Sequence, residues 1–248
     1  MTMQECSVAL KRKKIVVVPH FSARLVECPR HTGRIASWCK VNHIKEIFLV
    51  GGDTLLPLNY KSSIDFLRDF LEHNSGVEKI GFPIYPDGHA YIANHILNAD
   101  ILEKQTLLAN AGIAGMVSTQ LCFDPKIITT FIQMQRKSGM TLPFNIGFAG
   151  IVPLTHLIKI GLAIGLFPAI HYLKNNLGTV HDLAIKNYNP TTFIASLDQE
   201  IRETNLCVND INGFHAFTFN STLLTTAWLQ RVLETHISNN REVPISAK

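Results

Sequence analysis

The sequence predicts an α/β fold of the TIM (β/α)8 barrel type, incomplete, with six recognisable βα units in a single domain over residues 1–248. Three observations predict this class. Short, β-branched apolar runs alternate with helix-length amphipathic segments along the whole chain. The runs are continuously apolar, which is typical of parallel strands covered on both faces. Polar side chains gather where the runs end, which is where a barrel builds its site.

Six runs predict the strands in chain order: residues 14–20, 46–53, 79–86, 115–123, 144–151 and 213–220. An open, doubly wound sheet is the alternative, but such a sheet usually carries a glycine-rich first turn. The chain has no G-x-G-x-x-G motif and no Walker-type phosphate loop. The barrel is therefore favoured, with the objection that a complete barrel needs eight units.

Between the runs, apolar residues recur at helical spacing within residues 64–71 and 127–132. Asp124 and Pro125 predict the start of the second helix, with the aspartate as N-cap and the proline in the first helical position. Gly139 is placed to end the same helix. Residues 153–170 predict a buried helix, because the window contains His156 and Lys159 and is short for a membrane span.

The composition excludes several classes of protein. With 46% hydrophobic and 17% charged residues, the chain can bury a core and is not a disordered protein. A net charge of +4 is too small for a dedicated nucleic-acid binder. The basic cluster at residues 11–14 predicts a solvated lead-in to the first strand, with a phosphate contact as the alternative.

The five cysteines are odd in number, widely spaced and without a C-x-x-C pair. This pattern favours reduced thiols over a disulfide framework or a zinc site, and it predicts a cytoplasmic protein. Cys122 is flanked by apolar residues and is interpreted as a buried small hydrophobe. The eleven histidines include no H-x-x-x-H or H-E-x-x-H pair, so a zinc enzyme is not favoured.

Three strand ends carry the candidate chemistry. Gly51, Gly52 and Asp53 would let the backbone approach a planar or phosphorylated ligand beside a carboxylate, or form an ordinary βα turn. The segment 85–89 (YPDGH) combines an aromatic ring with two titratable groups, suited to ligand binding or acid–base work; a structural turn is the alternative. Gln120 could hold an amide-like ring edge, or be satisfied internally.

At these strand ends the chain resembles the methylenetetrahydrofolate reductase family. Five collinear stretches carry the resemblance: residues 19–24 (PHFSAR), 49–53 (LVGGD), 85–89 (YPDGH), 119–124 (TQLCFD, followed by Arg136, Gly139 and Pro143) and 213–220 (GFHAFTFN). Each motif is weak alone. Their common order over residues 15–230 makes the resemblance specific.

The resemblance implies an NAD(P)H oxidoreductase that uses FAD to reduce 5,10-methylenetetrahydrofolate to 5-methyltetrahydrofolate. It implies a flavin environment of five residues: His20, Asp53, Tyr85, His89 and Lys104. It implies Asp53 and Gln120 as catalytic residues, and a folate site of Gln120, Phe217 and Phe219. The charge, the histidine and cysteine spacings and the short apolar window predict no nucleic-acid, metal or membrane partner.

The chain departs from the family at its beginning, where about fourteen polar residues precede the first predicted strand. The family has two further βα units there, and its proposed general acid is a glutamate on the first. Without them we expect an open seam, covered by a second copy or a companion subunit. Two alternatives therefore stay open: a flavin-free folate methyltransferase or demethylase, and a non-catalytic subunit or remnant.

Overall fold

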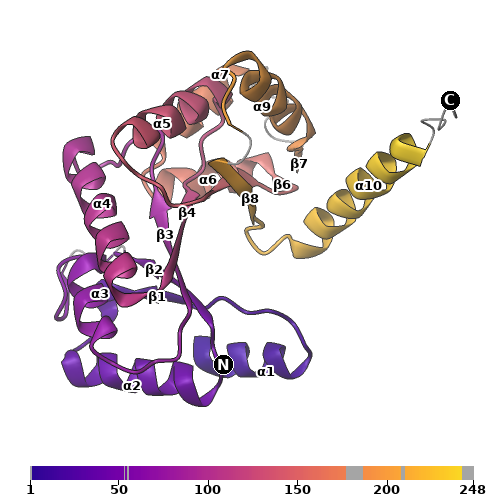
Figure 1. Ribbon diagram of the computed structural model, residues 1–248. Coiled ribbons are helices and arrows are strands. Elements are labelled where there is room, and N and C mark those ends of the chain that lie inside the picture. Colours follow the sequence, from indigo (N-terminus) through magenta and orange to yellow (C-terminus); the bar gives the residue numbers. More distant parts are fainter. Residues whose placement is uncertain (1, 53, 55, 177–186, 208–209, 242–248) are drawn as a thin grey trace, which may run out of the picture.

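The computed structural model describes residues 2–52, 54, 56–176, 187–207 and 210–241, with side chains described up to residue 234. Its centre is a six-stranded, fully parallel sheet in the order β1-β2-β3-β4-β5-β8 (Figure 1). A separate antiparallel pair, β6 and β7, lies beside it in the C-terminal half. The predicted α/β class with parallel strands is confirmed.

The strands of the main sheet and the antiparallel pair have these bounds: β1 His20–Ser22, β2 Glu46–Val50, β3 Lys79–Ile84, β4 Ala114–Thr119, β5 Phe144–Ala149, β6 Val152–Pro153, β7 Asn187–Tyr188 and β8 Ile211–Phe217. The described helices are α1 Met3–Arg12, η1 Ala23–Leu25, α2 Pro29–Val41, α3 Ser63–Leu71, α4 Asn94–Ala111, α5 Pro125–Lys137, α6 Leu154–Ala163, α7 Phe167–Asn176, α9 Thr191–Glu203 and α10 Thr222–Arg241.

Helix α5 forms for the reasons its sequence indicates. The Asp124 side chain accepts a hydrogen bond from the Lys126 N–H, and Pro125 occupies the first turn. Gly139 follows the helix with φ +92°, a left-handed conformation that glycine adopts without steric cost. The predicted helix bounds are therefore confirmed.

The first predicted strand is wrong over most of its length. Residues 15–19 form no strand, and pairing with β2 begins only at His20. Pro19 has no N–H to donate to a ladder. The basic cluster at 11–14 does not lead into a strand either: it ends helix α1, where Lys11 Nζ donates to the Asn42 and His43 carbonyls.

The predicted helix over residues 153–170 is two helices. α6 ends at Ala163 and α7 begins at Phe167, and Gly165 between them has φ +77°. A residue in this left-handed conformation cannot continue a right-handed helix. In the part of the chain that the structure describes, no helix combines the length and apolar character needed to cross a membrane.

Contacts across the sheet show that it is strongly curved. The His20 ring on β1 and the His215 ring on β8 have centroids 6.4 Å apart, although these strands lie at opposite ends of the strand order. A flat sheet would separate the two strands by about 24 Å. The sheet therefore curls toward the face that carries both rings. Among the described strands, β8 and β1 share no backbone pairing.

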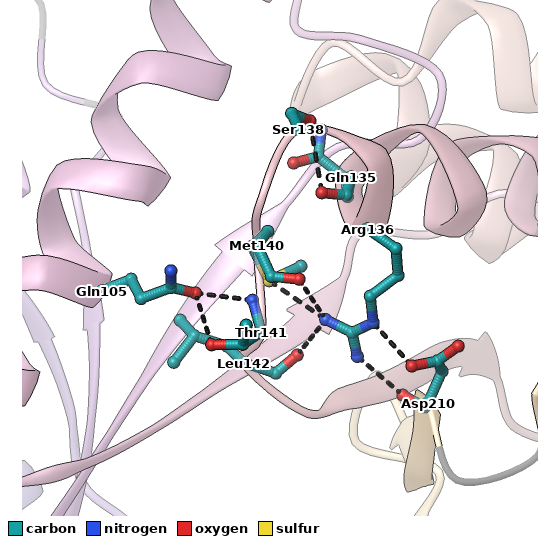
Figure 2. A network of polar contacts seen from close by, with 8 residues as sticks. All are labelled: Gln105, Gln135, Arg136, Ser138, Met140, Thr141, Leu142 and Asp210. Carbon is teal, nitrogen blue, oxygen red and sulfur yellow. Dashed lines mark hydrogen bonds and ion pairs between the residues drawn. The ribbon is translucent and has the colours of Figure 1, made fainter.

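Arg136, near the end of α5, holds the beginnings of β5 and β8 together (Figure 2). Its Nε donates to Asp210 Oδ1 at 2.7 Å, and one terminal nitrogen donates to the Met140 and Leu142 carbonyls at 2.8 and 2.9 Å. The guanidinium also lies 4.7 Å from the centroid of the Phe144 ring. We call this group at the amino ends of the strands the Arg136 cluster.

Helix α10 extends away from the sheet in Figure 1, anchored near its start. The Trp228 ring packs 5.8 Å from the Phe148 ring, and its Nε1 donates to Thr191 Oγ1 at 2.9 Å. The side chains of Leu223, Leu224 and Leu233 are exposed. The described part of this helix, up to residue 234, thus buries far less of its apolar surface than α3, whose Phe66, Leu67 and Phe70 are in the core.

Candidate functional site

Alternate residues of each strand share the concave face of the sheet, and near the carboxyl ends they form a cluster of rings. The His20 ring stacks on the Phe48 ring with centroids 4.6 Å apart. The centroid of the His215 ring lies 6.4 Å from that of Phe48 and 4.7 Å from that of Phe217. Phe219 stacks on Phe217 at 6.2 Å. We call these five residues the ring cluster. It brings together side chains from β1, β2 and β8 and from the turn after β8.

Glycines on this face make room for the rings. A Cβ on Gly81 would come within 2.5 Å of the Phe48 ring, and one on Gly147 within 2.7 Å of the Phe217 ring. Real Cβ atoms do not approach so closely, so a substitution at Gly81 would displace the Phe48 ring, and one at Gly147 would meet both the Phe217 ring and, at 2.1 Å, the Thr119 carbonyl oxygen. The concave face is thus shaped by the aromatic rings and the glycines opposite them.

The two histidines of the ring cluster are held toward their neutral form. Burial lowers the pKa of His20, and the nearby His215 lowers it further. Burial also lowers the pKa of His215. Both effects act because a charged imidazolium loses hydration in the cluster, and two such charges would repel each other. Sequence reasoning missed His215; its only signal was its place two residues before Phe217, on the same face of a strand.

Ser118 and Gln120 lie on the concave face of β4. Ser118 is 3% exposed, and its Oγ has no hydrogen-bond partner among the described residues. Buried hydroxyl groups normally have a partner, which is a bound ligand or water when the protein does not supply one. The partner of this hydroxyl can be a buried water or a ligand, and sequence reasoning missed it because an apolar run surrounds it.

Gln120 is partly satisfied within the chain. Its side-chain Oε1 accepts a hydrogen bond from the Leu121 N–H at 2.9 Å. The backbone N–H of Gln120 donates to the Ile84 carbonyl at 2.7 Å. The side-chain amide nitrogen makes no hydrogen bond to the described residues. Gln120 therefore presents two N–H donors at the end of β4, the chemistry a heterocyclic carbonyl or ring nitrogen would accept.

Tyr85 and His89 come together in the loop after β3. Their rings meet edge to face with centroids 5.0 Å apart, and the His89 ring also contacts Tyr91 at 6.1 Å. The Tyr91 N–H donates to His89 Nδ1 at 3.2 Å, which fixes the imidazole orientation. The structure thus pairs these two predicted residues.

Between Tyr85 and His89, Asp87 meets Cys122. The Cys122 thiol donates to Asp87 Oδ1 at an S···O distance of 3.3 Å. Burial raises the pKa of Asp87, and it also raises the pKa of the Cys122 thiol. Cys122 is buried as predicted, but it carries a polar contact that the apolar reading missed. Asp87 and Asp124 line a cleft of about 260 Å³ with the rings of Phe123 and Tyr172.

Lys104 lies away from the ring cluster. Its side chain is buried, forms an ion pair with Asp100 one helical turn earlier, and covers the Phe82 ring at 5.1 Å. Phe82 adjoins Gly81 on β3, so it faces the opposite side of the sheet from Phe48. Burial lowers the pKa of Lys104 while Asp100 raises it. Asp53, the remaining predicted residue, lies outside the described residues.

The concave carboxyl edge offers features that suit a planar flavin. It combines aromatic faces, the donors of Gln120, the orphaned Ser118 hydroxyl and, at Gly51, a position where an added Cβ would meet no atom of the described residues within 4 Å. The cleft beside Asp87 and Asp124 is smaller than the roughly 300–1,000 Å³ typical of ligand pockets. A dinucleotide would therefore have to lie along the concave edge. Comparison with protein-family models finds no match for this chain.

Proposed function

We propose that the protein is a flavin-dependent oxidoreductase that reduces 5,10-methylenetetrahydrofolate to 5-methyltetrahydrofolate with NAD(P)H. One observation carries the proposal: side chains from the ends of β1, β2, β4 and β8 converge on one concave face that holds an orphaned buried hydroxyl. Such convergence is how a barrel-type fold builds its site, and a barrel-type architecture is part of the proposal.

The residues of this face have distinct roles in the proposal. Bound FAD would supply the hydride transfer, and the protein binds and orients the reactants. Tyr85, His89 and His20 flank the flavin, with Asp53 expected beside it. Gln120 donates hydrogen bonds to the folate ring, and Phe217 and Phe219 offer it flat apolar surfaces.

The proposal also includes a cytoplasmic location, consistent with five free cysteines, and association with a second copy or a companion subunit along the open side of the sheet.

Flavin binding is the direct test. The purified chain should quench FAD fluorescence on titration, show a perturbed flavin absorbance band and oxidise NADH or NADPH when methylenetetrahydrofolate is added. Gln120→Leu should raise the folate KM and leave FAD affinity unchanged, because it removes the side-chain N–H donors together with the acceptor of the Leu121 N–H. Gln133→Leu on α5, which removes a side-chain amide that donates to the Thr204 carbonyl at 3.4 Å, is the matched control. A folded chain that binds folate but no flavin would refute the oxidoreductase and favour methyl transfer.

A further inference from the structure

A run of basic side chains follows helix α1 without a carboxylate beside it in the described chain. Arg12, Lys13 and Lys14 are exposed, and they form no ion pair with a described residue. The next two side chains are apolar and also exposed, Ile15 by 48% and Val16 by 89%. We call residues 12–16 the basic segment. It suits a partner surface on which carboxylates lie next to an apolar patch.

The backbone around this segment is open to contact as well. Residues 15–19 form neither helix nor strand, and the N–H groups of residues 16–18 donate to no described residue. Lys11 fixes the start of the segment, because its Nζ donates to the carbonyls of Asn42 and His43. These two carbonyls come just before β2. The basic segment therefore lies at the amino ends of the strands, beside the free edge of β1.

The cleft beside Asp87 and Asp124, which we call the acidic cleft, lies in the loops that follow β3 and β4. Phe123 and Tyr172 also line it, and its volume is about 260 Å³. Neither carboxylate forms an ion pair with a described residue. Burial raises the pKa of Asp87, and the charge of Asp124 raises it further. Two neighbouring carboxylates between aromatic rings favour a cationic occupant.

An apolar groove along α5 adjoins the acidic cleft. Pro86, Phe131 and Met134 line the groove, and Ile127 lines both the groove and the cleft. The Ile127 and Met134 side chains are exposed by 39% and 52%. Lys126 lines the groove too, so its charge would repel a cation placed there and direct that cation to the aspartates. The cleft and the groove thus place negative charge directly beside an apolar surface.

We propose that the basic segment of a second copy of this chain binds in the acidic cleft, with its lysines beside the aspartates and Ile15 and Val16 on the apolar groove. The complementary charges and adjoining apolar side chains of the two surfaces select this occupant. One chain cannot make the contact with itself, because α1 and α5 lie at opposite ends of the molecule (Figure 1). The inference rests on the association included in the proposed function and names its surfaces.

The contact joins two different surfaces, so it is heterologous and can continue from copy to copy. We therefore expect oligomers whose size grows with protein concentration. Raising sodium chloride from about 50 mM to about 500 mM should weaken the association, because salt screens exposed charges. Sedimentation velocity of the full chain measures both effects.

Two double variants separate the two surfaces. Lys13→Glu with Lys14→Glu changes the segment and keeps the cleft, whereas Asp87→Asn with Asp124→Asn changes the cleft and keeps the segment. Asparagine at position 124 can still cap α5. Each variant alone should associate at least about tenfold more weakly than the parent. An equimolar mixture should form 1:1 dimers and stop there, because it contains one intact segment and one intact cleft per pair.

Arg30→Glu with Arg34→Glu makes the same charge change on α2 and is the matched control, which should associate like the parent. Circular dichroism checks that every variant is folded. The proposal is refuted if the parent is monomeric at low salt, if the control weakens association as much as the segment variant, or if mixing the two folded variants does not restore it.

A synthetic peptide of residues 11–18 distinguishes a second copy from another protein. A parent that binds this peptide but stays monomeric accepts a basic segment from elsewhere, and that result also refutes the proposal. Binding of the peptide by the associating parent, and its loss in the cleft variant, supports it. Since no measurement here contains flavin or folate, failure of the oxidoreductase proposal would leave these outcomes unchanged.

Discussion

Polar groups at the amino and carboxyl ends of the parallel sheet differ in whether other protein groups satisfy their hydrogen bonds. At the amino ends, the Arg136 guanidinium meets a carboxylate and two carbonyls, and an aromatic ring covers it (Figure 2). Toward the carboxyl ends, the Ser118 hydroxyl and the Arg24 Nε are buried without described partners. Burial against aromatic rings lowers the pKa values of His20 and His215 there, which favours their neutral forms.

This difference separates stability from binding. A polar group whose hydrogen bonds are all satisfied within the protein contributes to folding and has nothing left for a ligand. An orphaned buried group costs folding free energy, and a ligand that pairs with it recovers that cost. We therefore expect substitutions at the amino ends to change stability, and substitutions toward the carboxyl ends to change binding.

The largest effect should follow from Arg136→Met. The substitution leaves Asp210 and two carbonyls without their donor, so we expect a loss of about 3 kcal/mol in the free energy of unfolding. Urea denaturation followed by circular dichroism measures it. Arg202→Met removes an exposed ion pair with Asp198 and should cost no more than about 0.5 kcal/mol. Equal losses in the two variants would contradict a stabilising role for the Arg136 cluster.

Two buried serines give an intermediate effect and a matched comparison. Ser75 is 5% exposed and its Oγ accepts from the Val77 N–H at 3.2 Å, whereas Ser118 is 3% exposed and unpartnered. Ser75→Ala should lose about 1 kcal/mol, while Ser118→Ala should be neutral or slightly more stable, because no hydrogen bond is lost. Denaturation of both variants without ligand measures this. A similar loss in Ser118→Ala would mean that a protein group satisfies that hydroxyl.

The smallest effect should be a pH dependence from the ring cluster. The folded-state pKa values of His20 and His215 lie below the unfolded value of about 6.5, so the unfolded chain binds more protons in that window. Stability should therefore fall as pH drops from 6.5 through the folded pKa values. His215→Phe should flatten this dependence in pH-dependent thermal melts. The exposed His156→Gln should keep the parent's slope; if His215→Phe keeps it too, the cluster is more hydrated than the ring contacts indicate.

Local signals account for what was predictable in the fold. Asp124, Pro125 and Gly139 marked the bounds of α5 because caps and left-handed glycines act within a few residues. The apolar runs marked most of the parallel strands, since a strand covered on both faces has no polar side. The strand predicted over residues 14–20 was wrong over most of its length. Apolar character shows that a segment can form a strand, but not that a neighbouring strand is there to pair with it.

The candidate site was less predictable. Tyr85 and His89 lie four residues apart in one loop, so their meeting is a local event. Lys104, predicted near the flavin phosphates, pairs with Asp100 on the face of α4 that packs on the sheet, an arrangement that no local pattern indicates. The His20–His215 contact joins residues 195 positions apart in the numbering, and no local pattern contains it.

By itself the sequence determined the alternation of strands and helices, the parallel sheet and the helix caps, because those features follow from periodicity and from the backbone preferences of single residues. Only the tertiary structure decided which polar groups are satisfied. It paired Arg136 and Lys104 with carboxylates and left Ser118 and Arg24 without described partners. The physical reason is that desolvation and pairing depend on which distant segments close over a group, and the curvature of the sheet sets that.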